Sequence, residues 1–171
     1  PATCTPGSAN ASPIADDDNY NASEDTLLTV ITANGVLVGD SDPEAAPITA
    51  VLLANALYGV VVMQNDGSFT YDPGDDYCGT DTFTYRAYDG AKYSAAATVT
   101  VDVACVNDAP TTIGTLADQT YPAATTVNLA TALGFDDIEN DVLAYSATGL
   151  PASLTINATS GFIAVLLMIC P

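Results

Sequence analysis

Residues 79–103 read GTDTFTYRAYDGAKYSAAATVTVDV, and this stretch decides the fold. Apolar side chains occupy every second position in its two halves, namely Phe83, Tyr85 and Ala87, then Val99, Val101 and Val103. A period of two is typical of strands that bury one face. Asp89-Gly90 lies between the halves, and Gly tolerates the positive φ of a tight turn. The stretch therefore predicts the closing hairpin of an antiparallel β-sandwich.

Composition limits the classes of partner. The 171 residues can hold one large domain or two of roughly 80–100 residues each. The net charge is −19, because 21 acidic residues face only Arg86 and Lys92, so nucleic acid and anionic membrane surfaces would be repelled. Hydrophobic residues make up 49 % of the chain, which indicates a folded protein rather than a disordered acidic one.

The absence of histidine excludes several catalytic classes. Ser-His-Asp and Cys-His catalysis and histidine-ligated zinc all require it. A glycosidase-type carboxylate pair stays open, but the acids cluster in turns, which favours solvated or cation-binding loops. We therefore interpret the chain as non-enzymatic. A carbohydrate-active enzyme or lectin is the minor alternative, with sugar-stacking candidates Tyr71, Tyr85, Tyr88 and Tyr93, although packing within the sheets is the preferred interpretation of these tyrosines.

Outward from the hairpin, the pattern predicts an all-β chain of two Greek-key sandwiches in tandem. We expect an N-terminal arm at 1–19, a first module at 20–106 and an incomplete second module at 107–171. Besides the hairpin, the first module has predicted strands near Tyr20 and at 27–31, 48–53, 58–63 and 68–72. Those of the second module are 119–121, 125–129, 142–147, 153–156 and 162–169.

Several features suggest an extracellular or cell-surface location. Sequons at Asn10, Asn21 and Asn157 are candidate glycosylation sites. The longest apolar run, 162–169, is far below the ~20 residues that a membrane helix needs, so no membrane span is expected. The four cysteines lack C-x-x-C spacing and so favour disulfides in an oxidising compartment over a metal site.

The hairpin register predicts one disulfide. If residues 89–92 form the turn, Tyr88 faces Tyr93 and Cys78 falls opposite Val103, within reach of Cys105. A bond there would pin the open end of the hairpin and stabilise it by ~2–4 kcal/mol. Cys4 and Cys170 then remain. They either pair between neighbouring subunits or stay as two free or locally buried thiols.

The last predicted strand is apolar on both faces, although a sandwich strand normally alternates. We predict about five strands for the second module against about seven for the first, so we expect part of its core to be uncovered. Both defects are repaired if subunits complete each other by strand addition. The residues assigned to this assembly are Phe162, Ile163, Val165, Leu166, Leu167, Met168 and Ile169.

Short segments of both modules resemble known repeats. In the first module they are Ala15-Asp16-Asp17, Ser23-Glu24-Asp25-Thr26, Leu37-Val38-Gly39-Asp40-Ser41-Asp42, Asp66-Gly67-Ser68-Phe69-Thr70-Tyr71, Gly79-Thr80-Asp81-Thr82-Phe83-Thr84-Tyr85 and Val106-Asn107-Asp108-Ala109-Pro110. These resemble the bacterial cadherin-like, VCBS-like tandem repeats of large surface adhesins. In the second they are Leu133-Gly134-Phe135-Asp136-Asp137, Leu143-Ala144-Tyr145-Ser146, Leu150-Pro151-Ala152-Ser153-Leu154 and Thr159-Ser160-Gly161, which resemble an incomplete putative-Ig repeat.

The resemblance implies a calcium-rigidified extracellular rod used for adhesion or surface structure. Calcium needs about six to eight oxygen ligands, and loops at one end of a sandwich can supply them. The candidate ligands at the linker pole are Asn107, Asp108, Asp136, Asp137 and Asp141. Those at the first pole are Asp16, Asp17, Asp40, Asp42 and Asp89, with Asp18 and Glu44 in the same loops.

Together these features predict a secreted structural subunit whose partners are copies of itself in a surface filament or sheath. The alternative is a fragment of a large calcium-dependent adhesin, whose partners would be surface glycans or other cell-surface proteins.

Overall fold

The computed structural model describes residues 9–112, 128–130, 134–148 and 154–165. The chain divides into two compact units: unit 1 is Pro1–Val106 and unit 2 is Asn107–Pro171. The strands of unit 1 are β1 (Asp18–Ser23), β2 (Leu28–Val30), β3 (Thr49–Ala54), β4 (Gly59–Met63), β5 (Phe69–Pro73), β6 (Gly79–Tyr88) and β7 (Ala97–Ala104), with the short 3₁₀ helix η1 (Thr32–Asn34) after β2. No described helix has the length and apolar character that crossing a membrane requires.

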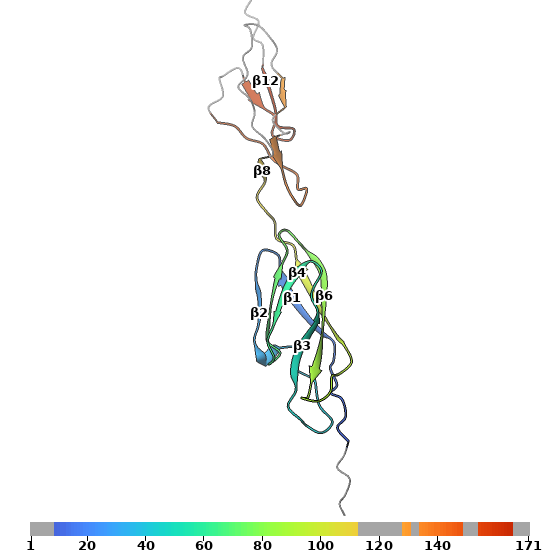
Figure 1. Cartoon of the computed structure of the whole chain (residues 1–171). Helices are drawn as coiled ribbons and strands as arrows, with labels where there is room; N and C mark the ends of the chain where they lie inside the picture. Colours follow the sequence, from blue (N-terminus) through green and yellow to red (C-terminus); the bar gives the residue numbers. More distant parts are fainter. Residues whose placement is uncertain (1–8, 113–127, 131–133, 149–153, 166–171) are drawn as a thin grey trace, which may run out of the picture. The chain divides into compact units, whose positions relative to one another are not determined.

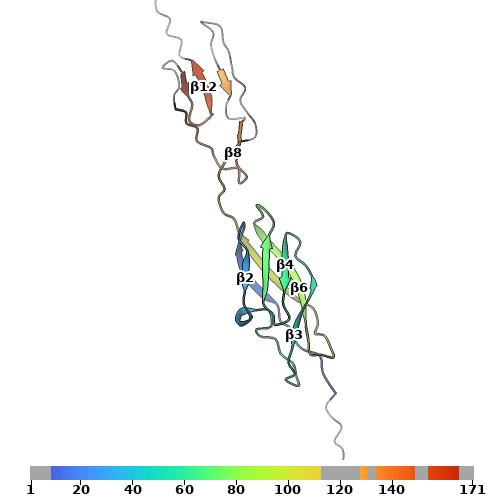
Figure 2. The same cartoon turned by 60° about the vertical axis from the view of Figure 1, so that its left-hand side comes forward.

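Unit 1 is a two-layer sandwich (Figure 1 and Figure 2). One sheet has the order β1-β7-β6-β3 and the other β2-β5-β4. The sandwich is not antiparallel throughout, because β1 pairs with β7 in parallel. The strand that enters the unit thus runs beside the strand that leaves it, in the same direction.

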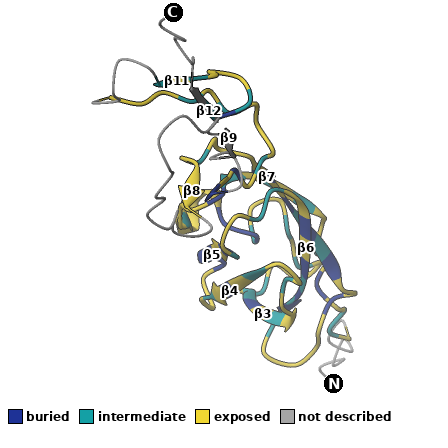
Figure 3. Ribbon diagram, turned by 90° about the horizontal axis from the view of Figure 1, so that it is seen from above, coloured by how far each residue is buried: buried dark blue, intermediate teal, exposed yellow. Residues whose placement is uncertain are grey.

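The core of unit 1 comes from the alternating positions of these strands (Figure 3). Phe69 and Phe83 meet edge to face with their ring centroids 5.3 Å apart, and Tyr20 packs on Phe69 at 5.0 Å. Val99 and Val101 of β7 are fully buried behind them. Burying one large apolar side chain stabilises a fold by about 1.5–3 kcal/mol, so this core is the main source of stability of unit 1.

A disulfide joins Cys78 to Cys105 beside the open end of the β6–β7 hairpin. This is the predicted pair, but the predicted register is wrong by one position. Tyr88 does face Tyr93, yet Gly79, not Cys78, lies opposite Val103. The offset arises next to the turn, where the Ala87 N–H donates to the Ser94 hydroxyl instead of a ladder carbonyl.

Unit 2 has shorter strands. They are β8 (Thr111–Thr112), β9 (Asn128–Ala130), β10 (Phe135–Asp136), β11 (Leu154–Ile156) and β12 (Phe162–Val165). β8 pairs with β10, and β12 lies between β11 and β9 in a three-stranded sheet.

The structure of unit 2 differs from the prediction in two respects. Residues 142–147 are not a strand: Leu143 and Tyr145 alternate with the exposed Ala144 and Ser146, but no ladder forms, and the Tyr145 N–H donates to the Ala158 carbonyl. The apolar segment begins as the central strand of its own unit, since Phe162–Val165 pairs on both sides. Residues 166–169, Cys4, Cys170 and the predicted strand 119–121 lie outside the described residues.

Candidate functional site

The hydroxyl of Tyr85 is the centre of an oxygen-rich cluster at one pole of unit 1. Its side chain is fully buried, and the hydroxyl donates to the Val36 carbonyl at 2.6 Å. Three more oxygens lie around it: Asp40 Oδ2 at 2.9 Å, the Asp16 carbonyl at 3.2 Å and Asp18 Oδ2 at 3.4 Å. A phenol has a single proton to donate, so these acceptors outnumber the donor.

The carboxylates of this cluster are partly buried and lie near one another. Burial, with the neighbouring Asp40 carboxylate, raises the pKa of Asp18 to about 6. Burial also raises the pKa of Asp40, and burial with the nearby Asp18 charge raises the pKa of Tyr20 to about 12. Each shift shows that added negative charge is disfavoured here. Two carboxylates and two carbonyls gathered in this way are the hard-oxygen set that calcium prefers.

The structure brings together some of the predicted first-pole ligands. The Asp16 N–H donates to Asp40 Oδ1 at 2.9 Å, which joins the lead-in to the loop after β2. Asp17 instead accepts from the Thr98 N–H at 2.6 Å. Asp42 caps its own loop by accepting from the N–H groups of Glu44 and Ala46.

Asp89 stabilises its own turn, because it accepts from the Ala91 and Lys92 N–H groups at 2.7 Å. It also accepts from Asn10 Nδ2 at 2.8 Å. The sequence predicted Asp16 and Asp40, and placed Asp18 in the same loops. It missed Tyr85 and the Val36 carbonyl. Their only signal was the inward phase of Tyr85 in the hairpin, which indicates core packing equally well.

A second acidic cluster lies in unit 2. Asp136, Asp137 and Asp141 line a cavity of about 250 Å³, together with Asn140 and Thr159. Asp137 is buried, and its Oδ1 accepts from the Asp141 N–H at 2.9 Å. The three acids therefore lie in a single loop, where Asp136 and Asp137 each accept from a backbone N–H group.

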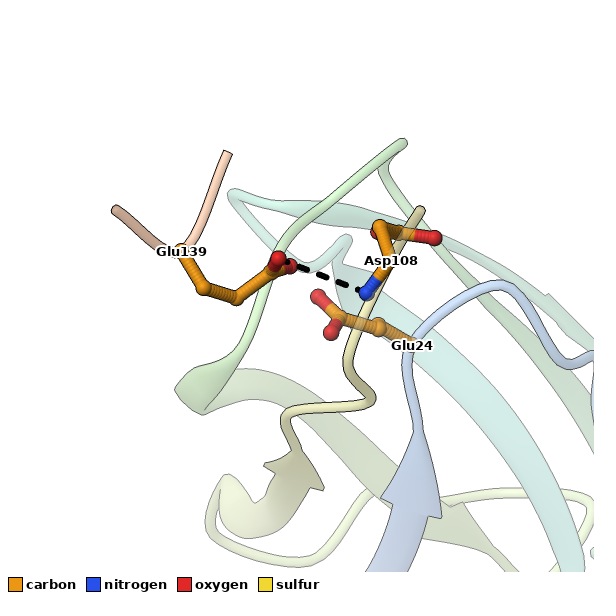
Figure 4. A group of neighbouring side chains, drawn as sticks. All are labelled: Glu24, Asp108 and Glu139. Atoms are coloured by element: carbon orange, nitrogen blue, oxygen red, sulfur yellow. Dashed lines mark hydrogen bonds between the residues drawn. The ribbon is translucent and has the colours of Figure 1, made fainter. Parts of the chain in front are cut away.

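Asp108 contacts another residue of that loop, whereas the Asn107 amide donates to the Asp108 carbonyl. The Asp108 N–H donates to Glu139 Oε2 at 3.3 Å, as Figure 4 shows. Asp136 pairs with Thr111, so the segment that follows Asp108 runs beside the acidic loop. Of the predicted linker-pole residues, Asp136, Asp137 and Asp141 thus lie in one loop, and Asp108 reaches that loop through its backbone N–H; Glu139 is a residue that the sequence prediction omitted.

Unit 2 also has an open apolar cavity of about 430 Å³. Its wall residues come from β10, the irregular segment 143–147 and the three-stranded sheet, and include Pro110, Phe135, Leu143, Tyr145, Ile156 and Ile163. Phe135 remains 40 % exposed although it meets Tyr145 edge to face. Among the described residues of unit 2, this cavity therefore exposes apolar surface to water.

Two of the candidate sugar-contacting tyrosines are unavailable for that role. Tyr71 and Tyr85 are fully buried, and the Tyr71 hydroxyl donates to the buried Asp81 at 3.0 Å. The sugar-stacking prediction is therefore wrong for this pair, because both rings belong to the core.

The sequon asparagines differ in access. Asn21 is exposed on β1. Asn157 is exposed and its Oδ1 accepts from the N–H groups of Thr159 and Ser160, which leaves the amide nitrogen outside that turn. Asn10 is half-buried, and its amide nitrogen is the donor to Asp89.

Comparison with known proteins identifies the fold family. The profile of the bacterial cadherin-like domain matches residues 10–104, more than half of the chain. The protocadherin GammaB4 extracellular domain aligns with 90 % of this chain at a TM-score of 0.55 and 17 % identity, which shows likeness of fold. The chain spans 29 % of that structure's length.

A glycoside hydrolase family 107 endo-fucoidan hydrolase aligns with 96 % of this chain and 25 % of its own, at a TM-score of 0.45 and 19 % identity. No curated protein matches. The profile match covers the sandwich of unit 1 from the lead-in at Asn10 to the end of β7. The chain therefore belongs to the bacterial cadherin-like domain family.

Proposed function

We propose that this chain is a non-enzymatic extracellular structural subunit that assembles with copies of itself into a surface filament or sheath by strand addition. Its family indicates an adhesive or structural role outside the cell. The observation that carries the proposal is the open apolar cavity of unit 2 beside a three-stranded sheet. Within the described residues, β9 and β11 each pair only with β12.

An open sheet edge beside an apolar cavity favours an added strand. Backbone N–H and C=O groups on the edge would pair with the incoming strand, and its alternate side chains would fill the cavity. Burying apolar surface stabilises by about 25 cal/mol per Å². Because β12 is already central in its own sheet, the added strand belongs beside β9 or β11.

Calcium and glycans complete the proposal. The oxygens around Tyr85 and the acidic loop of unit 2 would each hold a calcium ion, relieving the carboxylate crowding at both places. With a net charge of −19, bound cations would also reduce repulsion between copies. Exposed Asn21 and Asn157 are the sequons best placed to carry glycans.

The second candidate is a repeat segment of a longer calcium-dependent adhesin, in which other cell-surface proteins or glycans are the partners. The observation that favours it is the presence of an acidic cluster in each unit, as expected of tandem repeats stiffened by cations. Here unit 2 would be completed by its own chain rather than by a copy.

The two candidates separate by microscopy and sedimentation of the purified chain with calcium and with a chelator. The self-assembly proposal predicts filaments or concentration-dependent oligomers, and monodisperse particles at all concentrations would contradict it. Thr155→Lys adds a charge to the β11 edge and should reduce assembly, because charged edges resist pairing. Thr26→Lys adds the same charge to an exposed turn of unit 1 and should leave assembly unchanged.

A further inference from the structure

The chain enters and leaves unit 1 on two neighbouring parallel strands. β1 pairs with residues 99–104 in one register, from Asp18 opposite Val99 to Ser23 opposite Ala104. The chain therefore enters β1 at one end of this ladder and leaves β7 at the other end. Figure 1 shows the blue lead-in and the yellow chain that leaves β7 at opposite ends of unit 1. A pull along the chain thus drives the two strands past each other and loads all six pairs of the ladder together.

Two acidic side chains extend this ladder beyond its last pairs. At the entry, the Asp17 carboxylate accepts from the Thr98 N–H at 2.6 Å. At the exit, the Glu24 N–H donates to the Ala104 carbonyl at 3.1 Å, and Glu24 Oε1 accepts from the Val106 N–H. Glu24 is only 2 % exposed, so water competes little for these bonds. The pairing therefore follows the leaving chain to the last residue of unit 1.

The disulfide lies where the leaving chain meets the closing hairpin. Cys105 directly follows β7, and Cys78 directly precedes β6. Because β6 and β7 are antiparallel, a pull on the exit reaches the adjoining ends of both strands through this bond. Once unit 1 opens, the pull passes across the bond from Cys105 to Cys78, and residues 79–104 carry none of it. The disulfide therefore keeps the whole hairpin out of the stretched chain.

We propose that unit 1 is a tension-bearing module: the β1–β7 ladder resists a pull along the chain, and the Cys78–Cys105 disulfide limits how far the opened unit extends. This goes beyond the proposed function and does not rest on it, because the chain passes through β1 and β7 in a filament subunit and in an adhesin segment alike. A single hydrogen bond contributes little net free energy. A ladder opened pair by pair therefore yields easily, whereas one loaded along its length must lose several bonds in one event.

The segment that the disulfide withholds from extension is the one on which the core most depends. Residues 79–104 supply Phe83, Tyr85, Val99 and Val101, all of them buried. Their β6–β7 ladder lies behind the disulfide, so tension does not pull it apart. A hairpin kept in this way remains available for the other strands to pack on when the tension falls.

Stretching single molecules of the whole chain by its two ends tests the disulfide. With the bond intact, opening of unit 1 should release a chain shorter by the 27 residues between the cysteines, a difference of about 90 Å in an extended chain. The paired variant Cys78→Ser with Cys105→Ser should show the longer release. Cys4→Ser with Cys170→Ser leaves this bond in place and is the matched control. Equal release lengths in the two paired variants would overturn the role given to the disulfide.

Changing the direction of the pull tests the ladder in the unaltered sequence. One handle is moved from the N-terminal end to Thr26, in the exposed turn after β1, while the other stays at the C-terminal end. This pull begins at the exit end of the ladder and opens its pairs one at a time. Pulling by the two ends should need the higher force to open unit 1, by more than the scatter between molecules. Equal forces in the two directions would show that the ladder does not bear the load.

Two proline substitutions in β1 separate a lost ladder bond from a distorted strand. The Glu24 N–H points to β7, and alternate residues of a strand point the same way, so the Ala22 N–H faces β7 and the Asn21 N–H faces away from it. Ala22→Pro should lower the force of the end-to-end pull. Asn21→Pro, at a position where an edge strand tolerates proline, should leave that force within the scatter. An equal loss at both positions would contradict the inference.

These outcomes are distinct from those of the assembly experiment. If Ala22→Pro does not fold, the two pulling directions of the unaltered chain decide whether the ladder bears the load. Filaments together with equal forces and equal release lengths would leave the proposed function standing and overturn this inference. A chain that stays monodisperse but shows the predicted forces and lengths would do the reverse.

Discussion

Unit 1 and the described part of unit 2 are both β-structures, but they differ in how much apolar surface is buried. Unit 1 buries Phe69, Tyr71, Phe83 and Tyr85 between two sheets and pins its closing hairpin with a disulfide. In the described part of unit 2, the sheets are short and an apolar cavity of about 430 Å³ stays open. The difference shows how much of the unit 1 core depends on the long β6–β7 hairpin, which supplies Phe83, Tyr85, Val99 and Val101 to it.

The largest expected effect is loss of the unit 1 core. Phe69→Ala should destabilise unit 1 by about 3–5 kcal/mol, because the ring lies between Tyr20 and Phe83 and leaves a cavity. Thermal unfolding of the whole chain would measure it. Ile163→Ala, at a half-buried wall of the unit 2 cavity, should cost less. Equal losses at the two positions would mean that the units do not differ in packing.

The disulfide should matter to unit 1 alone. The paired change Cys78→Ser with Cys105→Ser opens a crosslink between residues 27 apart and should cost about 3 kcal/mol. Hydrogen exchange would show faster opening of β6 and β7, with β11 and β12 unchanged. Undisturbed exchange in the hairpin would contradict the view that this bond pins it.

Removing the Tyr85 hydroxyl tests the oxygen cluster. Tyr85→Phe should destabilise unit 1 by about 1–3 kcal/mol without calcium, because the Val36 carbonyl loses its buried donor. Chemical unfolding would measure the loss, and Tyr93→Phe, which alters an exposed ring, is the matched control. A Tyr85→Phe variant as stable as the unaltered chain would show that the hydroxyl contributes nothing to the pole.

The smallest expected effect is on how the stability of unit 1 depends on acidic pH. Hydrogen bonds from Ser68, then Thr32, lower the pKa of Asp66 to about 2 from 3.8. A folded-state pKa below the unfolded value stabilises above about pH 4, and that stability is lost as the pH falls toward 2. Asp66→Asn should therefore flatten the stability profile of unit 1 between pH 4 and 2, whereas Asp75→Asn, another exposed acid, should not. A profile unchanged in Asp66→Asn would refute this.

The sequence predicted unit 1 far better than unit 2, for a physical reason. Alternation in 79–103 reports which side chains face the core, so it located β6, β7 and their disulfide partner. The alternation of apolar and polar residues does not show which strand pairs with which. It could not show that β1 runs parallel to β7, or that Ser94 shifts the register by binding Ala87.

The same limit explains the errors in unit 2 and at the poles. Residues 143–147 alternate without forming a ladder. Phe162–Val165 pairs on both edges within its own unit, which the sequence alone does not distinguish from a donated strand. The candidate ligands were found by their acidity, which is a property of residues. The gathering of carbonyls and carboxylates around Tyr85 is a property of the fold.

The central claim is that unit 1 is complete by itself while unit 2 is completed by another copy. Hydrogen exchange of the full chain, followed from dilute to concentrated protein, tests it most directly. The account predicts that protection of the β9 and β11 amides rises with concentration while that of the β6–β7 ladder stays constant. Exchange at β9 and β11 that is independent of concentration would contradict it.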